Sequence, residues 1–170
     1  TLLILFENLL LELQQALQVL VSRKVVFSDI HRNPDRNHKL SIDLIVPLIV
    51  SDEKTERAVG VLIMQIDPYV FLYPFIQSWP TPSASAETLL IRREGNEVLF
   101  MNELRFRKDA ALSLRLPIDN PQSPAAMALR GELSATQGID YRGVPVISEM
   151  RKVSGTPCFV VSKIDKEELF

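Results

Sequence analysis

Two stretches of the sequence share one build, and this repetition is the strongest constraint on the fold. Residues 39–50 (KLSIDLIVPLIV) precede an apolar stretch that ends in Ile-Asp at 66–67, and residues 138–150 (GIDYRGVPVISEM) precede one that ends in Ile-Asp at 164–165. Apolar and polar residues alternate in these stretches, which is typical of β-strands with one buried face. The repetition predicts two copies of one unit, each finishing with antiparallel strands.

The first copy is predicted to contain a helix followed by strands. Residues 9–22 place their leucines and Val21 on one helical face, and we favour a helix for 1–8 as well, although a buried strand also fits that apolar run. An antiparallel meander follows, with strands at 23–33, 39–50 and 58–67. The polar segments NPDRN (33–37) and SDEKTER (51–57) are predicted to be its turns, and Pro47 to mark an edge or a bulge.

The second copy is predicted to be longer. A short helix begins at Pro68, capped by Asp67 and limited by Pro74; a hairpin turns at Gly95; and a second helix starts near Ser123 with Pro124 at its first position. Three strands then complete the chain. We therefore predict an α+β protein of two consecutive PAS-like units with antiparallel sheets and flanking helices, comprising a partial unit at 1–67 and a full one at 68–170.

Charge and composition exclude several classes of function. The 19 basic and 21 acidic residues give a net charge of −2, so we predict no nucleic-acid partner. The single cysteine, Cys158, lies in an apolar run and is interpreted as a buried hydrophobic residue. The apolar amino-terminal stretch is interrupted by Glu7, Asn8, Glu12, Gln14 and Gln15, which a membrane-spanning helix would not tolerate. Neither a nucleophile elbow nor a P-loop is present.

Three segments carry a resemblance to a known family. AETLLIRREGNEVLFMNELRFRKD (86–109) resembles the opening hairpin of the membrane-proximal module of a double Cache sensor domain. GIDYRGVPVISEMRKVSGTPCFVVSKID (138–165) resembles the end of that module, and the region from VVFSDIHRN to WPTPS (25–83) is similar to the segment that joins the distal module to it. The resemblance spans most of residues 25–166, and none of its motifs is catalytic.

The resemblance implies the extracytoplasmic, periplasmic part of a bacterial inner-membrane receptor with a histidine kinase, diguanylate cyclase or chemotaxis output. It implies a small-molecule ligand and no cofactor, and this segment itself would carry out no reaction. The amino-terminal helix is expected to pair with its copy in a homodimer through Leu10, Leu13, Leu17 and Val21. Two alternatives remain: a structural module that transmits without binding, and, less favoured, a small hydrolase.

Two groups of residues are candidates for ligand binding, and no catalytic residue is assigned. Tyr141, Arg142 and Arg151 could hold a small anion through guanidinium and hydroxyl donors, although pairing with surface acids such as Glu149 is the simpler interpretation. In the first unit the candidates are Asp29, His31 and Asp43. A metal site formed by His31 and His38 with Asp29 and Asp35 is conceivable, but their spacing matches no zinc pattern, so we predict a solvated turn and no metal.

Overall fold

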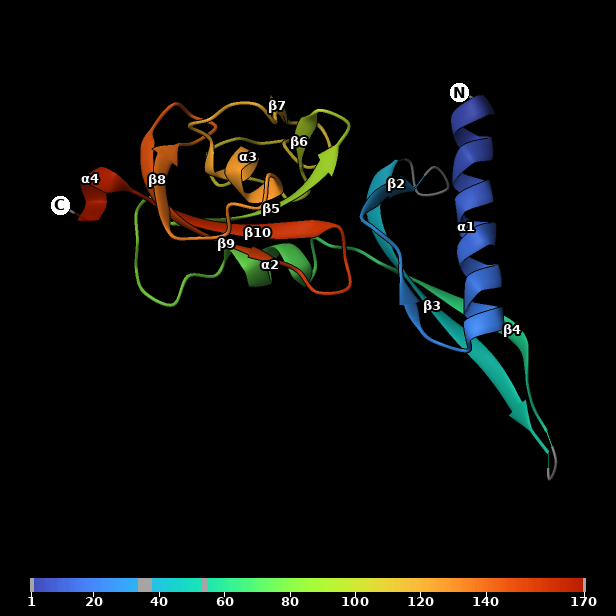
Figure 1. The fold of residues 1–170 in the computed structure, drawn as a ribbon. Helices are drawn as coiled ribbons and strands as arrows, with labels where there is room; N and C mark the ends of the chain where they lie inside the picture. Colours follow the sequence, from blue (N-terminus) through green and yellow to red (C-terminus); the bar gives the residue numbers. More distant parts are fainter. Residues whose placement is uncertain (1, 34–37, 53–54, 170) are drawn as a thin grey trace. The chain divides into compact units, whose positions relative to one another are not determined.

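The chain folds into two compact units, which are described separately. The computed structural model describes residues 2–33, 38–52 and 55–169, with side chains at residue 10 and from residue 12 onward. Unit 1 is Thr1–Pro68 and unit 2 is Tyr69–Phe170 (Figure 1). Among the helices described, none combines the length and the apolar character needed to cross a membrane.

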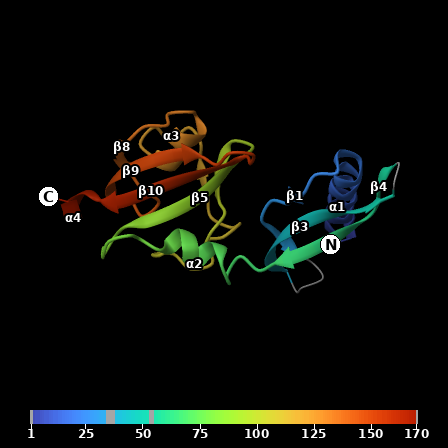
Figure 2. The same ribbon diagram turned by 90° about the horizontal axis from the view of Figure 1, so that it is seen from below.

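Unit 1 is a helix and an antiparallel sheet. Its elements are α1 (Leu2–Ser22), β1 (Val26–Phe27), β2 (His31–Asn33), β3 (Lys39–Ser51) and β4 (Glu56–Ile66). The long β3 is central, because β1 and β2 pair with it along one edge and β4 pairs with it along the other. Figure 2 shows α1 lying against the β3–β4 hairpin. The register of that hairpin shifts between Leu48 and Ile49, next to Pro47, as the proline predicted.

The prediction of one strand over 23–33 was wrong, because residues 28–30 interrupt it. The Ser28 hydroxyl accepts a hydrogen bond from the Asp43 amide at 2.7 Å, and the Asp29 carboxylate accepts one from the Ile30 amide at 2.8 Å. Short polar side chains that bond the backbone in this way compete with the strand ladder. β1 and β2 are therefore two short strands on one edge of β3. In the predicted turn at 33–37, residues 34–37 lie outside the described residues.

The amino-terminal helix was predicted correctly, and α1 extends the helical assignment to residue 2. Val19 is fully buried against the sheet. Four of the side chains predicted to form the apolar face are instead open to solvent in the single chain, at 53–86% exposure: Leu10, Leu13, Leu17 and Val21.

Unit 2 is built on a six-stranded antiparallel sheet. Its strands are β5 (Glu87–Glu94), β6 (Glu97–Phe100), β7 (Arg115–Pro117), β8 (Thr136–Ile139), β9 (Pro145–Lys152) and β10 (Cys158–Asp165). Their order is β7-β6-β5-β10-β9-β8, which places the opening hairpin and the closing strands side by side. The predicted hairpin at Gly95 and the three closing strands are confirmed. The three-residue β7, within the connecting segment, was not predicted.

Three short helices accompany this sheet: α2 (Leu72–Gln77), α3 (Pro124–Leu129) and α4 (Lys166–Leu169). α3 begins where it was predicted, with the Ser123 hydroxyl accepting from the Ala126 amide. The predicted start of α2 at Pro68 was wrong. The helix begins at Leu72, so that Pro74 falls in its first turn, where a missing amide proton costs no helical hydrogen bond.

The core of unit 2 lies between the sheet and α3, which covers the face opposite α2 (Figure 1). Leu89, Ile91, Phe100 and Val161 are nearly inaccessible to solvent. Small residues on α3 let the helix approach the sheet closely: Ala125, Ala126 and Ala128. Among the described residues of unit 2, the buried charged side chains are Glu87, Asp140 and Lys163, and Glu87 and Lys163 pair where β5 begins and β10 finishes.

Candidate functional site

Charged side chains enter the core of unit 2 at one end of its sheet. Glu87 precedes Leu89 and Ile91 at the inward-facing positions of β5, and Lys163 follows Val161 on β10. Glu87 and Lys163 are direct cross-strand partners, so their side chains share a face. Both side chains are only 1% exposed.

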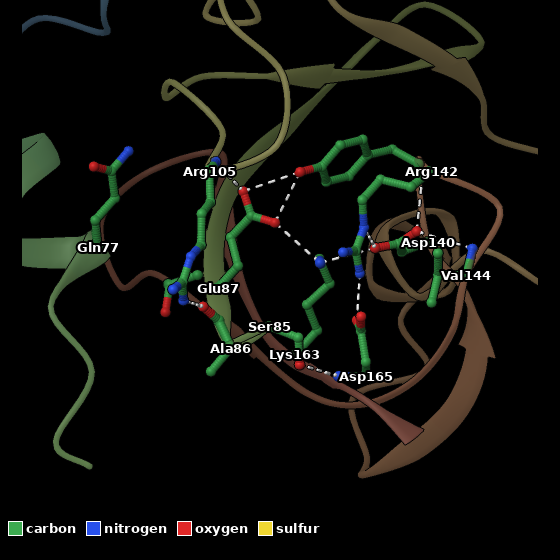
Figure 3. Close-up of polar contacts among 12 residues, drawn as sticks. Gln77, Ser85, Ala86, Glu87, Arg105, Asp140, Arg142, Val144, Lys163 and Asp165 are labelled. Carbon is green, nitrogen blue, oxygen red and sulfur yellow. Dashed lines mark hydrogen bonds and ion pairs between the residues drawn. The ribbon is translucent and has the colours of Figure 1, made fainter. Parts of the chain in front are cut away.

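These two residues form the centre of a charge network, a name used here for Glu87, Asp140, Tyr141, Arg142, Lys163 and Asp165. The Lys163 ammonium lies 2.9 Å from Glu87 Oε2 and 2.8 Å from Asp140 Oδ2 (Figure 3). Asp140 Oδ2 is also 2.6 Å from Arg142 Nε, and Arg142 pairs in turn with Asp165. A buried ammonium is tolerated because two carboxylates compensate its lost hydration.

Tyr141 and Phe106 complete the surroundings of these cations. The Tyr141 hydroxyl donates to Glu87 at 2.9 Å, and its ring packs edge-on against Phe100. The Arg142 guanidinium lies 4.2 Å from the centre of the Phe106 ring, which is within the range of a cation–π contact. The Asp140 carboxylate also accepts from the Arg142 amide, which holds the corner between β8 and β9.

The charge network is connected to the carboxyl-terminal end of unit 2. Arg142 binds Asp165, the last residue of β10, whose amide donates to the Ser85 hydroxyl at 3.0 Å. Ser85 and Ser83 also hydrogen-bond the carboxylate of Glu168 on α4. A change in the buried charges can therefore reach α4 through Arg142, Asp165 and Ser85.

The network shifts the proton affinities of its members. Burial alone would raise the pKa of Asp140, but the hydrogen bond and charge of Lys163, followed by those of Arg142, outweigh it and lower that pKa. Burial, together with the neighbouring Glu87 carboxylate, raises the pKa of Tyr141 above its ordinary value. Hydrogen bonds from Ser85 and Ser83 lower the pKa of Glu168 to about 2.

Unit 2 is therefore expected to lose stability in acid. A carboxylate whose pKa is lower in the folded state stabilises the fold above its unfolded pKa, near 4, and that contribution is lost as the pH falls toward the folded value. We expect the urea midpoint of unit 2 to stay level from pH 7 to 5 and to fall below about pH 4. The Asp140→Asn variant should be less stable at pH 7 and lose less stability in acid. An unchanged midpoint down to pH 2.5 would contradict this expectation.

Two spaces lie beside the charge network. Beneath α3, between Asp140, Tyr141 and Lys163, the cavity measures about 10 Å³, roughly the room for one water molecule. On the other side of Glu87 lies an open hollow of about 360 Å³, here called the Trp79 cleft. Its lining is Gln77, Trp79, Thr81, Ser83, Ala86, Glu87 and Arg105. Glu87 thus borders both the cleft and the network, between Arg105 and Lys163 (Figure 3).

The structure brings some of the predicted site residues together and separates others. Tyr141 and Arg142 are neighbours in the charge network. Arg151 does not join them: it lies toward the opposite end of β9, its side chain is 80% exposed, and it pairs with Glu149 at 3.2 Å. This is the surface pairing that was predicted as the simpler interpretation for Arg151. Whether any of the three contacts a ligand stays a prediction.

In unit 1 the predicted group does assemble. His31 Nε2 lies 3.5 Å from Asp43 Oδ2, and His31 Nδ1 lies 3.0 Å from the backbone oxygen of Asp29. Asp43 is only 1% exposed. This burial was not expected, because Asp43 is a polar residue that alternates with apolar ones along the strand.

Sequence reasoning missed the two residues at the centre of the network, Glu87 and Lys163. A signal was present, because each charge occupies the core-facing position of an alternating strand, in ETLLI and VVSKI. Two opposite charges at the buried positions of paired strands indicate a buried ion pair.

Comparison with known proteins places the fold. No known protein family and no curated protein matches the sequence. Among solved structures, the extracellular domain of mmHK1S-Z2, described as a histidine kinase, aligns with a TM-score of 0.55 at 12% identity over 91% of this chain. The ligand-binding domain of Mlp24, solved with asparagine, aligns with a TM-score of 0.48 at 10% identity over 89% of this chain.

The chain spans 55% of the length of each of these structures. The shared features are antiparallel sheets with a few flanking helices. The chain therefore has the predicted α+β fold, which it shares with the extracellular domain of mmHK1S-Z2.

Proposed function

We propose that the chain is the extracytoplasmic sensory segment of a bacterial membrane receptor. In this proposal it binds a small polar molecule and passes a conformational change to a kinase, cyclase or chemotaxis output domain, and it catalyses no reaction itself. The fold shared with the extracellular domain of mmHK1S-Z2 supports the sensory role. Binding can transmit a signal only by favouring one of two arrangements of the chain.

One observation carries the proposal: Glu87 borders the Trp79 cleft and is also the buried partner of Lys163. The cleft is large enough for a small molecule, at about 360 Å³, and it combines an aromatic ring with hydroxyl, amide and charged groups. A ligand bound there would act on Glu87 through Arg105, whose amide donates to the Glu87 carboxylate at 2.6 Å, and would so perturb a network that extends through Arg142 to Asp165. Glu87 would thus pass the presence of the ligand from the cleft to the charge network.

A thermal-shift screen with amino acids, carboxylic acids and nucleobases tests this function. We expect at least one probe to raise the melting temperature of the intact 170-residue chain by binding its folded state. Trp79→Ala should weaken binding of that probe about tenfold or more, because buried aromatic residues dominate many binding sites. Phe75→Ala is the matched control, since Phe75 belongs to α2, is 64% exposed and does not line the cleft.

A second candidate, a module that transmits without binding, is favoured by the filled core beneath α3. The cavity of about 10 Å³ admits no ligand at the covered face of the sheet. If no probe shifts the melting temperature, or if Trp79→Ala binds as tightly as the parent chain, ligand binding at the cleft is wrong and this candidate replaces it.

Homodimer formation through α1 stays a prediction. The four side chains expected to pair are exposed in the single chain, which supports the idea: Leu10, Leu13, Leu17 and Val21. Membrane anchoring of the whole receptor is likewise part of the proposal.

A further inference from the structure

His31 and Asp43 lie close together beneath α1 in unit 1 because of the register between β2 and β3. His31 on β2 lies opposite Ser41 on β3, and Asp43 is two residues farther along β3. Opposite residues share a face of a sheet, and so do residues two apart, so both side chains point to the same side. Glu12 of α1 reaches the same place, and one ligand atom from each residue lies within 4.8 Å of the other two.

The hydrogen bond at Nδ1 decides what His31 can offer this site. A backbone carbonyl oxygen only accepts hydrogen bonds, so the 3.0 Å contact with the Asp29 oxygen requires the proton on Nδ1. In the neutral ring Nε2 then carries a lone pair. This atom is buried and makes no hydrogen bond with any residue in the described part of the chain.

Nε2 nevertheless faces the carboxylate of Asp43, whose side chain is 2% exposed. A nitrogen lone pair and a buried carboxylate repel each other, and a cation between them removes this repulsion. That cation is either a proton on Nε2 or a metal ion bound by both groups.

The geometry favours the metal ion. The 3.5 Å separation is long for a charge-assisted hydrogen bond, which is usually about 2.7–2.9 Å. Two ligands that bind one Zn²⁺ at about 2.1 Å, in a tetrahedral arrangement, lie about 3.4 Å apart. We propose that His31, Asp43 and Glu12 bind a divalent transition-metal ion of the Zn²⁺ type, with at least one coordination position left open. The contact of Nδ1 with the Asp29 carbonyl is the support that metal-binding histidines ordinarily have.

Calorimetric titration of the intact chain with Zn²⁺, after treatment with a chelator, tests the site. We expect one ion per chain, and a higher melting temperature with Zn²⁺ than with the chelator. His31→Ala and Glu12→Gln should each weaken Zn²⁺ binding by at least about 10–100-fold. That is the usual cost of losing a residue that only orients a metal ligand. The control is His38→Asn, because His38 is the only other histidine, lies outside the cluster and has a left-handed φ of 57° that asparagine tolerates.

Several outcomes would overturn the proposal. The first is that the parent chain shows no heat of Zn²⁺ binding. The second is that His31→Ala binds Zn²⁺ as tightly as the parent chain, and the third is that His38→Asn loses as much Zn²⁺ affinity as His31→Ala does. If the chain binds no Zn²⁺ and NMR shows His31 as an imidazolium, the cation between His31 and Asp43 is a proton. Far-UV circular dichroism checks that His31→Ala is folded, and Glu12→Gln, a substitution of equal size on a helix surface, provides an independent readout.

Discussion

Replacing Lys163 with methionine is expected to lower the free energy of unfolding of unit 2 by about 3–5 kcal/mol. Methionine fills much of the same volume but leaves Glu87 without a cation in a site that is 1% exposed. Asp140 retains Arg142, whereas the partners that Glu87 retains among the described residues are neutral hydrogen-bond donors, the Tyr141 hydroxyl and the Arg105 amide. Urea unfolding followed by the fluorescence of Trp79, the chain's single tryptophan, reports on unit 2 directly.

The neighbouring strand supplies a matched control for Lys163→Met. Arg151 also forms an ion pair, but its side chain is 80% exposed, so Arg151→Met should change the free energy by no more than about 1 kcal/mol. Adding Glu87→Gln to Lys163→Met removes the uncompensated charge, and the double variant should be more stable than Lys163→Met alone. A loss below about 1 kcal/mol for Lys163→Met, or no recovery in the double variant, would contradict the importance assigned to this pair.

The repeating features of the sequence predicted the regular parts of the fold. Alternation of apolar residues located β3, β4, β5, β9 and β10, and Gly95 and Ser123 located a turn and a helix start. Errors arose where one local interaction outweighed the pattern, as at Ser28 and Asp29, whose backbone hydrogen bonds divide a predicted strand. The three-residue β7 has too few residues to produce a periodic signal.

The candidate sites were harder to predict because they depend on pairing between distant strands. Tyr141 and Arg142 were identified as polar groups at a corner, but their partners Glu87 and Asp165 lie 54 and 23 residues away along the chain. His31 and Asp43 were identified individually, whereas the contact between them follows from the register of β2 on β3. Glu12 belongs to a helix whose contact with the sheet no sequence pattern specified.

The two sites differ in how their charges are compensated, and this difference separates their proposed roles. In the charge network three carboxylates face two cations from the same unit, and hydrogen bonds from Tyr141 and backbone amides stabilise them further. A set already paired in this way suits transmission, because moving one member disturbs the others. In unit 1 the His31 lone pair faces a carboxylate, an arrangement that an added cation completes.

Gly138→Ala is expected to be the other strongly destabilising substitution, because β8 passes against the segment that leads into α3. A methyl group at this position would lie 2.5 Å from the backbone oxygen of Gln122 and 2.8 Å from the ring of Pro124. The Gln122 oxygen cannot move away freely, since it accepts a hydrogen bond from the Ile139 amide at 2.8 Å. Overpacking against a backbone atom belongs at the upper end of the usual range, so we expect a loss of about 3 kcal/mol.

Gly95→Ala is the matched control, because it tests the cost of a left-handed backbone conformation without any steric overlap. Gly95 has a left-handed φ of 60°, but a methyl group there would meet nothing within 4 Å, so its replacement should cost only about 1 kcal/mol of backbone strain. Both free energies come from urea unfolding monitored by Trp79 fluorescence, and far-UV circular dichroism at zero denaturant confirms that each variant is folded. If Gly138→Ala proves no more costly than Gly95→Ala, the close approach of β8 to Gln122 does not constrain the fold, and the position of α3 over the charge network must depend on other contacts.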